Sequence, residues 1–238
     1  MKLAICLQYH EADRVRAYEL AAMIAANEPK FRDDVILCLV NRWDCPTAPA
    51  EVVAPLELKF HVEQFTTTTR AAGWPAGCNA MARDVLRHAA QEWRFGAWHA
   101  VTGVMLLEPD CIPIARDWID QVKKEWHAAY VDLKWLMGTW RDGGGDLGHI
   151  NGNCVVVPDF IFKVDMTNMF EWLAWDCAIS PQVHTHWRVT DLICNRWKET
   201  GLTDETITTH RSGVGQPVLV HGVKDNSVWD YARRTLCP

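Results

Sequence analysis

Short apolar runs alternate with segments of helical periodicity along the first half of the chain. The apolar runs are short enough for strands, and the segments between them repeat apolar side chains at the spacing of one helix face. We expect strands over residues 3–7, 35–40, 60–65 and 100–107, and helices over residues 14–27, 77–93 and 118–129. Strands that alternate with helices predict a parallel sheet covered by helices.

The second half of the chain is less regular. We expect strands over residues 134–139, 152–157 and 217–220, and helices over residues 171–179, 190–199 and 227–234. No repeat, low-complexity tract or linker divides the sequence. We therefore predict one α/β domain over residues 1–238, with a mostly parallel central sheet flanked by helices.

Composition narrows the class of protein. No run approaches the roughly 20 apolar residues of a membrane-spanning helix, and the first residues lack the apolar stretch of a secretory signal, so we expect a cytoplasmic protein without a membrane partner. The net charge of -6 provides no overall attraction to phosphate polymers. The nine cysteines include no CxxC pair, which argues against a disulfide framework and a thiolate zinc site.

Polar residues with metal-binding or hydrogen-bonding side chains follow several predicted strands. These residues are Gln8, Tyr9, Asp44, Glu108, Asp110 and His221. In an open α/β sheet, ligands bind outside the carboxyl ends of the strands, so these side chains are expected to face one crevice. Two carboxylates and an imidazole suit a divalent cation such as Mn²⁺ or Mg²⁺ that bridges a diphosphate.

Two short motifs carry a resemblance to a known family. The triplet Glu108-Pro109-Asp110 at the end of a buried strand resembles the DxD signature of the GT-A glycosyltransferases, with Glu108 in place of the usual first Asp. The segment from His221 to Lys224 is similar to the late His-Gly-Lys segment of that family. The resemblance implies a Rossmann-like GT-A domain in which Asp110, His221 and Glu108 hold the metal and Lys224 contacts the diphosphate of a nucleotide-sugar.

The resemblance also extends to weaker positions around the donor. It implies base recognition by Gln8, Tyr9 and Asp44, and it places Arg70, Gly77 and Asn79 at a helix entry beside the nucleotide. Free backbone N–H groups at the start of a helix would favour a phosphate there. Residues 1–112 are then the nucleotide-sugar half and residues 113–238 the acceptor half, which ends in the metal and diphosphate segment. UDP is the donor nucleotide that the resemblance favours.

A catalytic base is expected on a late helix, as in family members that invert configuration. Asp176 is the candidate, because burial beside Trp172 and Trp175 would raise the pKa of its carboxyl towards that of a working base. The competing acids are Asp142, Asp146 and Asp191. The glycines at positions 143–145 predict a flexible lid or acceptor loop over residues 141–153.

The acceptor stays open at this point: a glycan, a small molecule, a protein or a modified DNA base. Small single-domain chains of this kind resemble bacteriophage glycosyltransferases, some of which modify hydroxymethylated DNA. Arg188, Arg196 and Lys198, with Trp187 and Trp197 between them, predict a phosphate and stacking surface for such DNA, or else an ordinary solvated helix. A nucleotidyltransferase and a noncatalytic nucleotide-binding or glycan-binding module are the alternative functions, and the oligomeric state is open.

Overall fold

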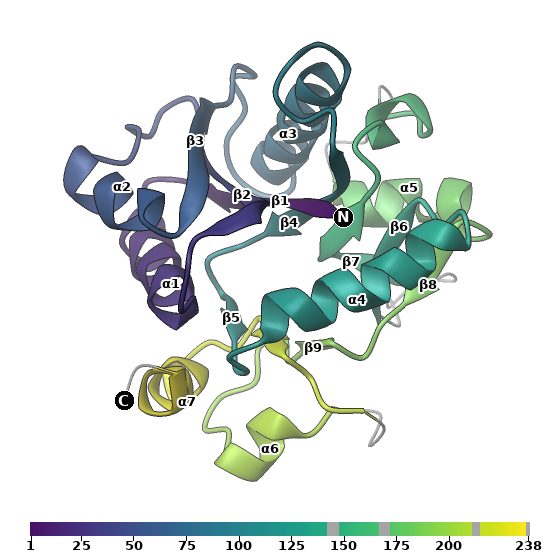
Figure 1. The fold of residues 1–238 in the computed structure, drawn as a ribbon. Coiled ribbons are helices and arrows are strands. Elements are labelled where there is room, and N and C mark those ends of the chain that lie inside the picture. Colours follow the sequence, from purple (N-terminus) through teal and green to yellow (C-terminus); the bar gives the residue numbers. More distant parts are fainter. Residues whose placement is uncertain (142–147, 167–171, 211–214, 237–238) are drawn as a thin grey trace.

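A mixed sheet of seven strands forms the centre of the computed structural model, which describes residues 1–141, 148–166, 172–210 and 215–236. The strands are β1 (Lys2–Tyr9), β2 (Arg32–Asn41), β3 (Phe60–Thr66), β4 (Val101–Leu107), β6 (Leu136–Arg141), β7 (His149–Val156) and β8 (Trp187–Val189). Their order across the sheet is β3-β2-β1-β4-β7-β6-β8 (Figure 1). Only β7 runs antiparallel to its neighbours. The mostly parallel α/β sheet predicted from the sequence is confirmed.

Helices cover both faces of this sheet. They are α1 (Arg14–Asn27), α2 (Ala50–Glu57), α3 (Ala76–Phe95), α4 (Trp118–Val131) and α5 (Trp175–Val183), with a short 3-10 helix at Phe160–Phe162. The helices α6 (Asp204–Thr208) and α7 (Ser227–Leu236) lie instead beside a smaller sheet (Figure 1). On one face α4 places Trp126 against Gly103 of β4, and the indole Nε1 donates to the carbonyl of Thr102 at 3.1 Å. On the opposite face α3 stacks His88 on Phe65 of β3.

A second, smaller sheet joins the end of the chain to the middle. It consists of β5 (Cys111–Pro113), β9 (Ile193–Asn195) and β10 (Leu219–His221), in the order β5-β10-β9. The helix predicted over residues 190–199 is therefore wrong, because Ile193–Asn195 pairs in parallel with β10. Pairing with a distant strand outweighs the local helical pattern, and Lys198 has a φ of 67°, which no α-helix accommodates.

Other differences from the sequence-based expectation are smaller. The helices α2 and α6 and the strand β5 were not predicted, and α2 contains Pro55, which argues locally against a helix. The strand expected over residues 152–157 begins earlier, at His149. Within the described ranges, no helix has the length and apolar character needed to cross a membrane.

Candidate active site

The small sheet brings His221 to the acidic pair that follows β4. His221 pairs in register with Cys111, the residue after Asp110, and the backbone N–H of Gly222 donates to the carbonyl of Asp110 at 3.2 Å. His221 Nε2 lies 3.2 Å from Oε2 of Glu108 and 3.3 Å from Oδ1 of Asp110. The three side chains that the sequence assigns to a metal thus meet at the carboxyl end of β4.

The charges in this cluster depend on one another. Burial alone would lower the pKa of His221, but the carboxylates of Asp110 and Glu108 outweigh burial and raise this pKa to about 9. Burial would raise the pKa of Asp110, but His221 and Lys224 lower it further than burial raises it. The imidazole of His221 and the carboxylate of Asp110 therefore stabilise each other's charged forms.

The geometry of His221 fits a cation site. Its side chain is 3% exposed, and neither ring nitrogen has a hydrogen bond of good geometry to any residue in the described ranges, despite the short distances to both carboxylates. A buried nitrogen without such a partner costs free energy unless another group satisfies it. A divalent cation held by Glu108, Asp110 and His221 would bind Nε2 of His221 and both carboxylates, and so supply the partner that this nitrogen lacks.

A tight turn after β10 places Lys224 beside the acids, where it meets Trp197 from the segment after β9. Lys224 Nζ lies 3.4 Å from Oδ2 of Asp110 and 4.0 Å from the ring centroid of Trp197. Gly222 has a φ of +86°, and a Cβ at this position would approach the Cα of Trp197 to 3.0 Å. Only glycine allows this close turn without strain. The arrangement puts a positive charge and a half-exposed aromatic face next to the acidic pair.

Asn153 supports Glu108 and was missed by the sequence analysis. Its side chain is fully buried in β7 and accepts a hydrogen bond from the Glu108 N–H at 2.8 Å. The same amide donates to Oε2 of Glu108 at 2.9 Å and to Oδ1 of Asn151 at 3.2 Å. Two asparagines in the middle of a largely apolar strand are a signal that could have identified this support, because buried amides need partners.

Asp176 lies in the first turn of α5 and is buried. Burial raises the pKa of its carboxyl, the positive charge of His149 opposes that rise, and the negative charge of Glu108 adds to it. His149 Nε2 is 3.8 Å from Oδ2 of Asp176, and the N–H of Cys177 donates to Oδ1 at 2.9 Å. A Cβ on Gly152 would lie 3.6 Å from Oδ2 of Asp176, and the next residue, Asn153, bonds Glu108, so Asp176 lies in the same region as the acidic pair.

The other candidate acids and the lid are placed less fully. Asp142 and Asp146 lie outside the described residues, as do residues 142–147 of the predicted lid. Asp191 forms an ion pair with His210, with Oδ1 and Nδ1 3.5 Å apart. Arg141 ends β6 and residues 149–153 belong to β7, so the lid expected over residues 141–153 is wrong at both ends, and only its middle, residues 142–147, stays a prediction.

The predicted base-recognition residues are only partly available to a ligand. Tyr9 is 1% exposed and packs edge-on against Tyr18, so only its backbone can face a nucleotide. Gln8 is half-buried at the end of β1. Asp44 accepts two hydrogen bonds from Arg42, at 2.6 and 2.7 Å, and this guanidinium lowers the pKa of Asp44.

The start of α3 differs from the sequence-based expectation. The N–H groups of Gly77 and Asn79 donate to the carbonyls of Gly73 and Pro75, at 2.7 and 2.9 Å. They are therefore not free for a phosphate, because the turn before the helix already satisfies them. The Asn79 amide donates to the carbonyl of Leu173 at 2.9 Å, which ties α3 to the segment before α5. Arg70 lies 5.8 Å from the ring centroid of Trp43, beyond β2.

Two of the three basic side chains of the predicted DNA-binding surface have partners within the described parts of the protein, and Lys198 alone of the three is exposed without such a role. Arg196 is 8% exposed and donates to the carbonyls of Thr206 and Thr209, both at 2.7 Å. Arg188 forms ion pairs with Glu125 and Asp132, with nitrogen–oxygen distances of 3.8 and 3.4 Å. The helix that would have aligned these side chains is replaced by β9, so Arg196 serves the protein's own backbone.

Comparison with solved structures identifies the fold. No protein-family profile matches the chain, and no curated protein sequence is significantly similar to it. Mouse xyloside xylosyltransferase 1 superposes with a TM-score of 0.53 at 11% identity, over 93% of this chain and 98% of that one. An active-site mutant of LgtC gives a TM-score of 0.58 at 11% identity, over 98% and 95%.

A third similar structure is TarS from S. aureus in complex with UDP-GlcNAc. It gives a TM-score of 0.51 at 10% identity, over 94% of this chain but only 59% of TarS. At sequence identities this low, the superposition establishes the fold but not the activity, which has to be argued from the site. The chain has the GT-A fold of nucleotide-sugar glycosyltransferases, as its acidic triplet and its late histidine segment predict.

Proposed function

We propose that this protein is a metal-dependent glycosyltransferase that moves a sugar from a nucleoside diphosphate donor to a hydroxyl group of an acceptor. The observation that carries the proposal is the meeting of Glu108, Asp110 and His221 at the carboxyl end of β4, in a chain with the GT-A fold. The carboxyl edge of an open sheet is where such folds bind their ligands. UDP is favoured as the nucleotide, since a structurally similar protein binds UDP-GlcNAc.

The residues of the site divide into metal ligands and supports. Glu108, Asp110 and His221 would hold Mn²⁺ or Mg²⁺, which neutralises charge on the leaving diphosphate when bound. Lys224 adds a second positive charge on the same side, beside Asp110. Asn153 holds Glu108 in place through hydrogen bonds to its backbone and its carboxylate.

Asp176 is the proposed general base. Its raised pKa suits a carboxylate that takes the proton from an acceptor hydroxyl, because a base is most effective when its pKa is near the working pH. Residues 113–238, which contain Asp176, would then form the acceptor half, and residues 1–112 the donor half. His149 Nε2 lies 3.8 Å from this carboxylate, but burial lowers the pKa of His149, so its imidazole is neutral at neutral pH and leaves the pKa of Asp176 raised.

A glycan or small-molecule acceptor is favoured over DNA. The basic surface that supported a modified DNA base is reduced to Lys198, because Arg196 is buried and Arg188 is paired with acids. The Trp197 ring is 39% exposed beside the acidic pair, and such an aromatic face can stack on the apolar face of a sugar.

Calorimetric titration with UDP, GDP and their sugars, with and without Mn²⁺, tests the donor site. We expect Mn²⁺-dependent binding that is lost in Asp110→Asn and retained in Asp230→Asn, a control that removes an exposed carboxylate of α7. Binding of no nucleotide by the folded wild type would overturn the proposal. Metal-dependent donor binding without sugar transfer or donor hydrolysis, over a panel of acceptors, would instead indicate a noncatalytic binding module.

A further inference from the structure

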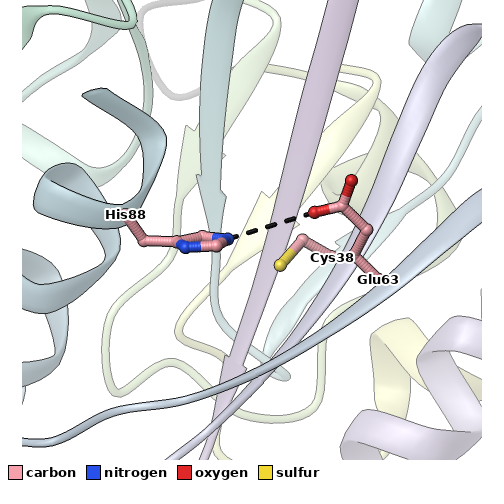
Figure 2. A group of neighbouring side chains, drawn as sticks. All are labelled: Cys38, Glu63 and His88. Atoms are coloured by element: carbon pink, nitrogen blue, oxygen red, sulfur yellow. Dashed lines mark ion pairs between the residues drawn. The ribbon is translucent and has the colours of Figure 1, made fainter. Parts of the chain in front are cut away.

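A row of polar and thiol side chains crosses three neighbouring strands away from the proposed active site. In the register of the sheet, Cys6 of β1 is opposite Cys38 of β2, and Cys38 is opposite Glu63 of β3. Because residues opposite one another in a sheet point to the same face, all three side chains face α3. His88 of α3 reaches down to this row, as Figure 2 shows for Cys38 and Glu63.

The side chains converge closely enough to share an ion. One ligand atom each from Cys38, Glu63 and His88 lies within 4.8 Å of the others. His88 Nε2 is 4.0 Å from Oε2 of Glu63 (Figure 2), and it is buried without a hydrogen bond to any residue of the described ranges. Zn–N and Zn–O bonds of about 2.0–2.1 Å in a tetrahedron place nitrogen and oxygen ligands roughly 3.4 Å apart. Small rotations of these side chains would reach that spacing.

Neighbouring aromatic side chains already orient two of these groups. The His88 ring stacks on Phe65 with centroids 4.2 Å apart and an interplanar angle of 8°. Trp98 Nε1 donates to Oε1 of Glu63 at 2.9 Å, which leaves Oε2 directed to His88. Hydrogen bonds of this kind to a ligating carboxylate are typical of metal sites, because they fix the direction of the free oxygen.

We propose that Cys38, Glu63 and His88 bind a zinc ion, and that Cys6, which is opposite Cys38 but outside this group of three, moves in as the fourth ligand. A set of thiol, imidazole and carboxylate groups prefers Zn²⁺, whereas the oxygen-rich set at Glu108 and Asp110 suits Mn²⁺ or Mg²⁺. The lack of a CxxC pair does not exclude this site, because its ligands come from three strands and a helix. Bound zinc would tie α3 to the three strands on which it packs.

The site is open enough to solvent for an ion to enter, and an ion that binds there would displace the proton of the Cys38 thiol. Glu63 and His88 are 31% and 19% exposed, so the site opens to solvent on their side, while both cysteines are fully buried. The hydrogen bond that the Cys38 thiol donates to Cys6, together with burial, raises the pKa of Cys38 well above its ordinary value. Zinc must therefore replace a thiol proton, and its affinity rises with pH.

Cobalt substitution tests this site separately from the active site. Co²⁺ bound to a thiolate has a charge-transfer absorption band that Co²⁺ bound only to oxygen and nitrogen lacks. We expect this band when the reduced, full-length wild type is titrated with Co²⁺, and its loss when one equivalent of Zn²⁺ is added. The band should be absent from Cys38→Ala and from His88→Phe, which retains the stacking on Phe65.

Two further variants test whether another thiol of the chain produces the band. Cys154→Ala removes a fully buried thiol from the same sheet and should keep the band. Cys177→Ala should also keep it, although Cys177 lies with His149 and Asp176 in another group able to hold a metal. Loss of the band in Cys177→Ala but not in Cys38→Ala would overturn the proposal. If the variants fail to fold, X-ray absorption of the zinc-loaded wild type decides, since absence of sulfur from the zinc shell would equally refute it.

Discussion

Replacing Asn153 by alanine should both destabilise the protein and weaken its metal site. The fully buried amide makes two hydrogen bonds to Glu108, one with the backbone N–H and one with the carboxylate. A buried donor without a partner costs about 1–3 kcal/mol, and a hydrogen bond to a charged group contributes about 1.5–3 kcal/mol. Because the Glu108 side chain is 45% exposed, water replaces part of this loss. We expect the free energy of unfolding to fall by about 2–3 kcal/mol.

Urea denaturation and Mn²⁺ titration of the same samples measure the two effects. Mn²⁺ affinity should fall by about 10–100-fold in Asn153→Ala, as for other residues that position a metal ligand. Thr139→Val is the matched control: the buried Thr139 hydroxyl donates to the carbonyls of Thr190 and Ile193, so its loss should lower stability without changing Mn²⁺ affinity. Mn²⁺ affinity in Asn153→Ala equal to that of the wild type would refute the role assigned to Asn153.

Three further predictions concern residues around the acidic pair. The pKa of His221 is about 9 in the folded protein and about 6.5 in the unfolded chain. Protonation of His221 therefore stabilises the metal-free fold fully below pH 6.5, and this stabilisation is lost as the pH rises through 9. The unfolding free energy should fall by about 3 kcal/mol over that range, and His221→Gln should lack this slope in urea denaturation at each pH. Gly222→Ala should lower stability by about 1–3 kcal/mol because of its positive φ, and a thermal melt with no shift would contradict this. Asp176→Asn should reduce turnover by about 100- to 10,000-fold while calorimetry shows unchanged donor binding; equal turnover would remove Asp176 as the base.

Local sequence signals predicted the long elements well. The strands β1, β2, β3 and β4 and the helices α1, α3 and α4 lie where the hydrophobic pattern places them, because each buries a continuous run or a single face. The short strands β5 and β9 have no such pattern. They exist because β10 offers backbone groups to both, and this pairing depends on segments that are far apart in the chain.

Some residues of the candidate site could be predicted from local sequence motifs, and others could not. The acidic triplet at the end of a buried strand and the late His-Gly-x-Lys segment could be recognised from the sequence, since each is a short motif at a strand end. The role of Asn153 could not be assigned in this way, because it depends on β7 lying beside β4. The burial of Arg196 could not be predicted either, because the two carbonyls that accept its hydrogen bonds belong to α6 and to the residue after this helix.

The sequence by itself thus determined the α/β class, the long strands and helices, and the residues with metal-binding chemistry at strand ends. Hydrophobic periodicity and strand-end motifs are local, so they can be read along a single chain. Only the tertiary structure decided that His221 meets Glu108 and Asp110, and that Cys6, Cys38 and Glu63 form one row beneath His88. Both arrangements depend on strand order and register, which packing of the whole core selects and no short segment encodes.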